Sequence, residues 1–247
     1  MSIVLPKEKS GVDKRFCKAK FLMMGQSKIG KSEFWAQDPK ALFLEAEPGL
    51  NYIECLKVPI RSWKDLIDVH TQLVQITAKG EEFPYSVIVI DTIDRVLDLA
   101  EENVIVHAKE FYKKIADRIE SIGEVPEGGG WARANNKVMN MLNKFDEFPC
   151  AVALIGHLTI KKIEDGTRKY DKSTISLWKG MGRNVLGWVD HIMHLQSSMV
   201  GDELRRTVYS IPTQSREAGS RGGVIPDGWQ WKEDMKVNYD NFRGLFT

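Results

Sequence analysis

Residues 25–32 read Gly-Gln-Ser-Lys-Ile-Gly-Lys-Ser, a complete G-x-x-x-x-G-K-S phosphate-binding loop. Its glycines allow consecutive backbone N–H groups to point at phosphate oxygens. Lys31 supplies a positive charge for the β- and γ-phosphates of a nucleotide, and the Ser32 hydroxyl can ligate Mg²⁺. The loop therefore predicts a site for a nucleoside triphosphate with Mg²⁺. The expected cofactor-binding residues are Gly25, Gln26, Ser27, Lys28, Ile29, Gly30, Lys31 and Ser32.

The segments on both sides of this loop support the prediction. The run Phe21-Leu-Met-Met24 is apolar, so residues 19–24 are expected to form a buried strand, and residues 32–37 can begin a helix that Asp38-Pro39 ends. A strand, a loop and a helix in this order are the context in which such a loop binds phosphate. A glycine turn with an incidental lysine is the alternative.

A second element of the predicted nucleotide site is an acidic residue that follows an apolar strand. Residues 86–90 read Ser-Val-Ile-Val-Ile, and Asp91 comes directly after them. Ligands of open α/β sheets bind at the carboxyl ends of the strands, so Asp91 is expected beside the phosphate-binding loop. There it would hold Mg²⁺ through water. The alternative is an ordinary helix cap.

Short apolar runs alternate with helical patterns along the chain, which is typical of a mostly parallel sheet flanked by helices. The fold class is therefore α/β. The expected strands are 19–24, 41–44, 86–90 and 151–155, with 190–195 and 204–211 as edge or antiparallel strands. The expected helices are 62–78, which Ser62 and Asp65 would open as a capping box, 93–119 and 131–146. The expected irregular loops are 124–130 and 159–183.

The composition describes one domain with a sizeable core. The chain has 247 residues, of which 43% are hydrophobic, and a formal net charge of +1. Such a balance excludes a surface that is basic throughout, but it allows a local basic patch. No signal peptide or transmembrane run is recognisable, so a cytoplasmic protein is expected. The expected organisation is an N-terminal tail or peripheral strand at 1–16 and one domain at 17–247.

The segment Leu42-Phe-Leu-Glu-Ala-Glu47 resembles the second core strand of RecA-like ATPases, which ends in an alanine–glutamate pair. The resemblance implies that Glu47 polarises the water that attacks ATP, and Glu45 is expected on the same side of the strand. Residues 151–157 resemble the core strand on which RecA itself carries a glutamine that senses the γ-phosphate, and His157 takes that position here. A Glu-Pro-Gly turn and a histidine bonded to backbone are the alternatives for Glu47 and His157.

The order of these motifs resembles a family of phage-encoded RecA-like nucleotide-binding proteins implicated in single-strand annealing and recombination. The resemblance covers about residues 17–230. It implies a RecA-like P-loop NTPase core with antiparallel strands at its C-terminal side, and the cofactors ATP and Mg²⁺. It further implies single-stranded DNA as a ligand, a ring or filament of identical subunits, a single-strand DNA-binding protein as a partner, and the host cytoplasm as the location.

Two loops of RecA-like proteins face the DNA, and the resemblance places them at about 121–135 and 159–183. The second range holds seven basic and three acidic residues. Basic side chains with aromatic rings that stack on unpaired bases are typical of non-specific single-strand binding. The alternative is a solvated charged hairpin with a tryptophan packed below it. The candidate DNA-binding residues are Trp131, Arg133, Lys161, Lys162, Arg168, Lys169, Trp178, Lys179 and Arg183.

Residues 213–229 follow the last expected strand and contain two arginines. RecA-like ATPases often complete their site with basic residues of a neighbouring subunit, which offset charge on the transferring phosphoryl group. By this resemblance Arg216 and Arg221 are the candidates, and Arg221 is preferred for its glycine-rich setting. An ordinary surface loop is the alternative.

The sequence favours an ATP-hydrolysing protein that acts on single-stranded DNA in phage recombination or replication. A hexameric helicase-like motor core and a non-catalytic DNA-binding protein switched by ATP are the alternatives. Turnover of ATP stimulated by DNA favours an enzyme, whereas tight binding without turnover favours the switch. A small-molecule kinase is less favoured, because no acceptor pocket or lid motif is recognisable.

Overall fold

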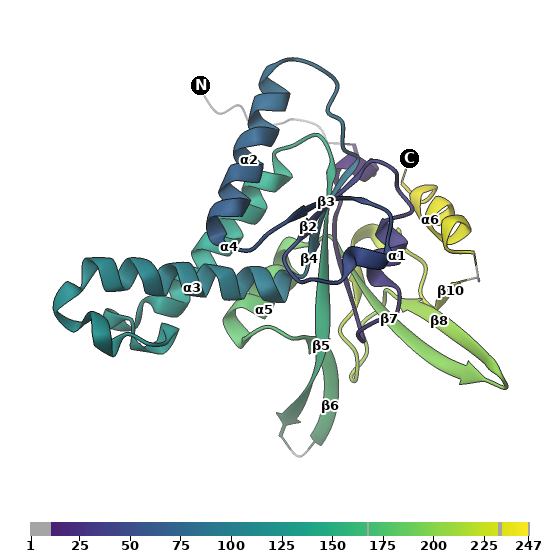
Figure 1. The fold of residues 1–247 in the computed structure, drawn as a ribbon. Coiled ribbons are helices and arrows are strands. Elements are labelled where there is room, and N and C mark those ends of the chain that lie inside the picture. The colour runs from purple at the N-terminus through teal and green to yellow at the C-terminus, as the bar shows by residue number, and fades with distance from the viewer. Residues whose placement is uncertain (1–10, 167, 232–233, 247) are drawn as a thin grey trace.

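The computed structural model describes residues 11–166, 168–231 and 234–246. In this part of the chain the strands form one sheet, shown in Figure 1. The strands are β1 (Lys20–Gly25), β2 (Ala41–Glu45), β3 (Leu56–Pro59), β4 (Val87–Asp91), β5 (Ala151–Asp165), β6 (Arg168–Ile175), β7 (His191–Val200), β8 (Glu203–Tyr209), β9 (Gly219–Ser220) and β10 (Trp229–Trp231).

The centre of this sheet is parallel. The strands follow the order β10-β8-β7-β1-β5-β4-β2-β3, and β1 pairs in parallel with both β5 and β7. β4 lies in parallel between β5 and β2, whereas β8 and β10 add antiparallel strands formed by the C-terminal part of the chain. The predicted α/β fold class is confirmed, with a mostly parallel sheet and antiparallel strands on the C-terminal side.

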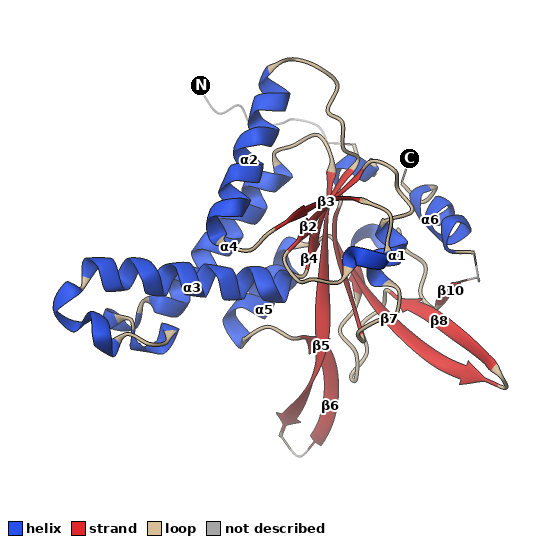
Figure 2. Cartoon of the chain, in the orientation of Figure 1, coloured by secondary structure: helices blue, strands red, loops and turns tan. Residues whose placement is uncertain are grey.

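Helices cover both faces of the sheet (Figure 2). α2, α3, α4 and α5 lie on one face, and α1 and α6 lie on the other. Successive side chains of a strand point to opposite faces of the sheet. In β1, Leu22 and Met24 therefore pack toward α2 to α5, and Phe21 and Met23 pack toward α1 and α6. The helices are α1 (Lys31–Trp35), α2 (Trp63–Ala78), α3 (Ile93–Phe111), α4 (Gly130–Asp146), α5 (Lys179–Trp188) and α6 (Met235–Arg243).

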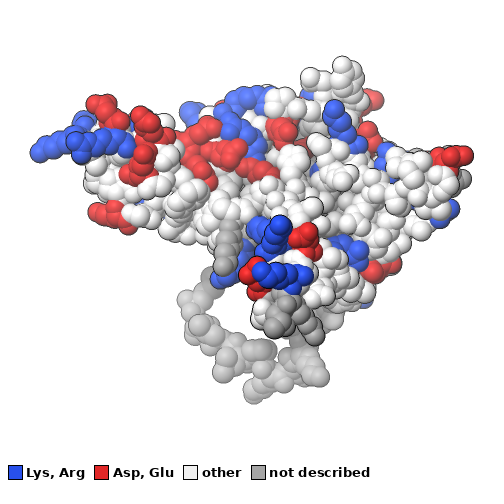
Figure 3. Space-filling view, turned by 90° about the horizontal axis from the view of Figure 1, so that it is seen from below, with Lys and Arg blue, Asp and Glu red and all other residues white. Residues whose placement is uncertain are grey.

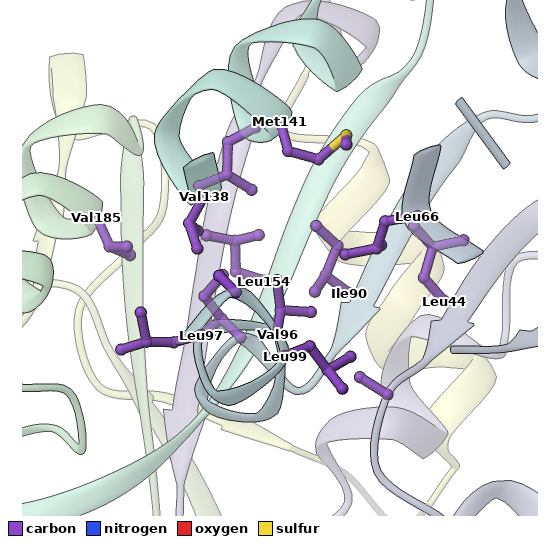
Figure 4. Packing of buried hydrophobic residues seen from close by; sticks show 14 of the residues in the cluster. Leu44, Leu66, Ile90, Val96, Leu97, Leu99, Val138, Met141, Leu154 and Val185 are labelled. Atoms are coloured by element: carbon purple, nitrogen blue, oxygen red, sulfur yellow. The ribbon is translucent and has the colours of Figure 1, made fainter. Parts of the chain in front are cut away.

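The larger of the two cores lies between the sheet and the helices α2 to α5. Figure 4 shows side chains of the sheet meeting side chains of these helices. All of the labelled residues are buried, so each methylene among them is removed from water, which stabilises the fold by roughly 0.8 kcal/mol per group. The labelled residues are Leu44, Leu66, Ile90, Val96, Leu97, Leu99, Val138, Met141, Leu154 and Val185.

The predicted helices agree with the structure at their starts. The Ser62 hydroxyl accepts from the backbone N–H of Asp65, and the Asp65 carboxylate accepts from that of Ser62, so the predicted capping box opens α2. α4 begins at Gly130, close to the predicted start. α3 ends at Phe111, earlier than predicted, and Lys113–Arg118 continues as a 3₁₀ turn.

The prediction of an irregular loop at 159–183 is wrong. β5 continues past the sheet to Asp165, and β6 returns antiparallel to it, so most of this range is a two-stranded arm. Figure 1 shows the arm projecting from the sheet. Its strands carry alternating charged residues rather than a long apolar run, which is why the sequence pattern did not predict them. The predicted tail or strand at 1–16 lies mostly outside the described residues, and residues 11–15 have no regular structure.

The C-terminal segment packs against the short helix that follows the phosphate-binding loop. The Phe34 ring of α1 stacks on Trp231 of β10 with 4.9 Å between ring centres. The Tyr239 hydroxyl of α6 donates to Asp38 at 2.7 Å, and the Ser86 hydroxyl donates to the same carboxylate oxygen at 2.6 Å. These contacts of β10 and α6 hold α1 and the residues that follow it in position. No helix within the described residues is both long and apolar enough to cross a membrane.

His191 at the start of β7 makes stability depend on pH. Its ring stacks on Phe21, and burial lowers the pKa of His191 from 6.5 to about 4. The unfolded chain therefore takes up a proton at a higher pH than the folded chain, and stability is lost as pH falls through this window. We expect the free energy of unfolding to fall by roughly 2 kcal/mol between pH 7 and pH 5 through this residue.

Urea denaturation of His191→Gln at the two pH values measures this effect. The variant should lose that part of the pH dependence, whereas the exposed His107→Gln should keep it. An unchanged dependence in His191→Gln would show that the ring takes up its proton equally readily in the folded and the unfolded chain.

Candidate nucleotide-binding site

The phosphate-binding loop joins β1 to α1, and the backbone requires glycine at two of its positions. Gly30 has a φ of 103°, in the left-handed region that side chains disfavour. A β-carbon on Gly25 would lie 2.9 Å from the carbonyl oxygen of Leu195, which is closer than β-carbons approach such atoms. The loop conformation therefore depends on both glycines.

The Lys31 side chain lies inside the loop. Its Nζ donates to the carbonyl oxygens of Gly25 at 2.9 Å and of Gln26 at 2.8 Å. Burial lowers the pKa of Lys31, and the carboxylates of Asp91, Asp94 and Glu47 oppose this effect. The ammonium group is thus held where phosphate oxygens would approach the loop.

Ser32 and Asp91 meet, as the predicted metal site requires. The Ser32 hydroxyl donates to Oδ2 of Asp91 at 2.7 Å. Burial raises the pKa of the Asp91 carboxyl, although the hydrogen bond from Ser32 and the charge of Lys31 act in the opposite direction. A hydroxyl and a carboxylate are hard oxygen ligands that suit Mg²⁺, so this pair fits a magnesium-bound nucleotide.

Glu47 and His157 lie on the other side of the same space. His157 is opposite Gly25 in the pairing of β5 with β1, and Glu47 follows the end of β2. Oε2 of Glu47 lies 3.3 Å from the Thr92 hydroxyl and 3.8 Å from Nε2 of His157. The Glu47 side chain is 48% exposed, so its carboxylate is open to water from the cavity.

The expectation that Glu45 points to the same side as Glu47 is wrong. Oε1 of Glu45 accepts from the backbone N–H of Leu50 at 3.2 Å, and the buried carboxylate also pairs with Lys57 and Arg61. β2 ends at Glu45, so the strand alternation that would align the two glutamates ends there as well. Glu45 therefore holds the turn after β2 in place and does not reach the cavity.

One cavity of about 360 Å³ brings the predicted residues together, and its volume suits a small molecule. Tyr52 is fully exposed at its rim. Three predicted loop residues do not line it: Gly25 ends β1, Gln26 offers its carbonyl to Lys31, and Ile29 is buried in the core. The lining residues include Ser27, Lys28, Gly30, Lys31, Ser32, Glu33, Glu47, Tyr52, Asp91, Thr92 and His157.

Two residues at this site were missed by the sequence reasoning. Thr92 caps α3 and donates to Glu47 from its hydroxyl. Asp94 accepts a hydrogen bond from the backbone N–H of His157 at 3.1 Å. The spacing Asp91-Thr-Ile-Asp94, directly after the strand, was the available signal.

The basic residues predicted to bind DNA divide between the two faces of the β5–β6 arm. Lys161 lies opposite Lys172 in the strand pairing. Both line a cavity of about 280 Å³, together with Arg183 of α5 and Glu217. The Lys172 ammonium pairs with Glu217 at 2.9 Å. This face gathers three basic residues around one acidic residue.

The other face of the arm is balanced in charge. Lys162 lies opposite Asp171, and the Lys169 ammonium pairs with Glu164 at 2.8 Å. Figure 3, which views the molecule from the side to which the arm points, shows basic and acidic side chains close together in its centre. The side chains of Arg168 and Lys179 lie outside the described part of the structure.

The two tryptophans predicted near DNA contact each other. Trp131 at the start of α4 and Trp178 before α5 have ring centres 5.4 Å apart, edge to face. Trp178 is half-buried, as the alternative of a packed tryptophan expected, whereas Trp131 is exposed. Arg133 is also exposed, and it lies two residues after Trp131 in the first turn of α4. Trp131 is therefore the ring that a base could reach.

Neither candidate arginine lines the nucleotide cavity of its own chain. The Arg216 guanidinium lies 3.6 Å from the centre of the Tyr209 ring. Arg221 donates to Asp190 at 2.9 Å and to the carbonyl of Gly187 at 3.1 Å. Asp190 precedes β7, so Arg221 lies at the opposite end of the parallel strands from the phosphate-binding loop. Their role toward a neighbouring subunit stays a prediction.

Comparison with known proteins identifies the family. Residues 17–222 match the model of the AAA domain family. The chain belongs to this family. The matched range includes the phosphate-binding loop, Glu47, Asp91 and His157, so this domain is of the P-loop ATPase type.

Individual relatives of this AAA domain protein are distant. The SPbeta prophage-derived uncharacterized protein YorG of Bacillus subtilis (strain 168) is 28% identical over 206 residues, covering 81% of this chain and 58% of YorG. The chain thus spans little more than half the length of that relative. Two solved structures are similar, each over 78% of this chain and 77% of theirs. They are the KaiC-like protein PH0186 of Pyrococcus horikoshii OT3, with 12% identity and a TM-score of 0.37, and the flagellar accessory protein FlaH of Methanocaldococcus jannaschii, with 10% identity and a TM-score of 0.40.

Replacing Lys31 tests the site directly. Lys31→Ala removes the charge inside the loop, and we expect ATP to bind about 100-fold more weakly, because a hydrogen bond to a charged group is lost. Isothermal titration with a non-hydrolysable ATP analogue measures the affinity. Lys40→Ala, which alters an exposed lysine paired with Glu82, serves as the control and should bind normally. Equal affinity for both variants would place the phosphates elsewhere.

Proposed function

We propose that this AAA domain protein hydrolyses ATP to ADP and phosphate with Mg²⁺, and that it acts on single-stranded DNA. One observation carries the proposal: the buried Lys31, the Ser32–Asp91 pair and the open carboxylate of Glu47 surround a single cavity. Each is a group that phosphoryl transfer to water uses. All of them lie at or just after the carboxyl ends of the parallel strands.

The loop side of the cavity is suited to binding phosphates. Lys31 would exchange its bonds to the carbonyls of Gly25 and Gln26 for bonds to phosphate oxygens. The Ser32 hydroxyl and the Asp91 carboxylate would hold Mg²⁺, directly and through water. When bound, the ion neutralises charge on the phosphates.

Glu47 is suited to activating water. The Thr92 hydroxyl orients its carboxylate, and the exposed half of the side chain leaves room for a water molecule. Glu47 would accept a proton from that water while the oxygen of the water forms a bond to the γ-phosphorus. The bond between the γ-phosphorus and ADP would break, and ADP would leave. His157 stands beside the carboxylate and is suited to respond to the same phosphate.

Glu47→Gln separates binding from hydrolysis. The amide keeps the shape of the side chain but accepts no proton, so we expect turnover to fall by about 100-fold or more while ATP affinity is retained. Phosphate release and analogue titration measure the two quantities. Glu54→Gln, at an exposed glutamate outside this cavity, should leave both unchanged. Wild-type protein that binds ATP tightly without turnover would support the ATP-switched alternative instead.

The proposed DNA surface is the face of the arm that holds Lys161 and Lys172, with Arg183 beside it. β5 runs from His157 at the nucleotide cavity directly into this arm, so the DNA and ATP sites would share one strand. The exposed Trp131 adds a ring on which an unpaired base can stack. The prophage origin of the relative YorG supports a role in phage recombination or replication.

The two faces of the arm provide a matched test. Lys161→Ala with Arg183→Ala should weaken binding of a single-stranded oligonucleotide and make the slope of log affinity against log salt shallower by about 1.4, because each lost charge accounts for about 0.7 on a single strand. Lys162→Ala with Lys169→Ala removes the same charge from the opposite face and should have a smaller effect. Fluorescence anisotropy over a salt series, with ATP turnover measured with and without DNA, records both results. A larger loss in the second pair would move the DNA to that face.

A further inference from the structure

Asp94 lies in the first turn of α3, and its carboxylate faces β5. Its Oδ2 accepts from the backbone N–H of His157 at 3.1 Å and lies 3.5 Å from Nδ1 of the same residue. The other ring nitrogen, Nε2, lies 3.8 Å from Oε2 of Glu47. The imidazole therefore stands between two carboxylates, of which Asp94 is 19% exposed and Glu47 is 48% exposed.

Packing does not explain why residue 94 is acidic. Burial raises the pKa of the Asp94 carboxyl, so the surroundings disfavour its charge. Its second oxygen, Oδ1, is buried and has no hydrogen-bond partner within the described residues. A buried acceptor without a partner destabilises a fold, and its presence calls for an explanation. The contacts of Oδ2 with His157 provide one.

We propose that Asp94 is a positioning residue that holds the proton of His157 on Nδ1 and thereby turns Nε2, as an acceptor, toward Glu47. The hydrogen bond at one nitrogen of an imidazole decides which nitrogen carries the proton. Nε2 then accepts a hydrogen bond from the Glu47 carboxyl after that group has taken a proton from water. This inference rests on the proposed function, because it assigns Glu47 the role of general base.

Of the carboxylates near the His157 ring, Asp94 is the one that lies beside Nδ1. Glu47 approaches Nε2 from the loop after β2. Asp91, at the end of β4, is close enough to interact with the ring charge, but its hydrogen bond goes to Ser32. The carbonyl of His157 accepts from the backbone N–H of Ser176 at 2.8 Å. With Asp94 on its N–H, the backbone of His157 is fixed on both sides, and the ring has a defined position.

A double-mutant cycle of Asp94→Asn and His157→Ala tests this role. The amide of Asp94→Asn keeps an oxygen for the backbone N–H of residue 157 but removes the negative charge that favours the proton on Nδ1. In the wild-type background we expect kcat for ATP hydrolysis to fall about 10-fold with KM unchanged. In the His157→Ala background the same substitution should change kcat less than about 2-fold. An equal loss in both backgrounds would overturn the proposal, because a purely structural effect does not need the imidazole.

Nitrogen-15 spectra of the histidine rings test the position without ATP turnover. His157 is assigned as the ring whose signals disappear in His157→Ala. The wild type should show a protonated Nδ1, and Asp94→Asn should shift the tautomer toward a protonated Nε2. Asp98→Asn, at an exposed aspartate of α3 paired with Arg95, should leave the ring and kcat unchanged. A protonated Nε2 in the wild type would contradict the inference, whereas inactivity of the wild type with the expected tautomer would contradict only the proposed function.

Discussion

The parallel pairing of β1, β5, β4 and β2 sets the positions of all groups at the site. Gly25 lies opposite His157, Asp91 opposite Ile155, and Glu45 opposite Asp91. The loops that follow these parallel strands therefore all begin at the same end of the sheet. A shift of one residue in the pairing of β4 would turn the Asp91 side chain away from the cavity. The two helical layers hold this register, because each strand buries side chains on both faces. The chemistry at the edge thus depends on apolar packing well below it.

The electrostatics of the cavity favour the proposed ligand, a nucleotide that carries a cation. The charges of Asp91, Asp94 and Glu47 act on Lys31, and burial raises the pKa of both aspartates. A triphosphate alone would add further negative charge to this group. A magnesium-bound nucleotide would bring positive charge to the side where Ser32 and Asp91 meet, which would reduce the repulsion.

Local signals predicted much of this fold and site. Glycine positions, strand ends and the Ser62–Asp65 cap each depend on a few neighbouring residues, and the structure gathers the predicted Lys31, Ser32, Asp91, Glu47 and His157 around one cavity. The failures involve distant partners. Glu45 is turned by Leu50, Lys57 and Arg61, and the role of Asp94 depends on a residue 63 positions later. Such pairings follow from the tertiary structure and leave no periodic pattern in the sequence.

The contact of α6 and β10 with α1 also orders events during synthesis. The phosphate-binding loop leaves the ribosome about two hundred residues before Trp231 and Tyr239, which stand behind its helix. The Tyr239–Asp38 bond spans 201 positions, so the segment that supports the end of α1 is made long after the loop itself. A nascent chain therefore carries the complete loop sequence long before it has the residues that pack against the helix after the loop.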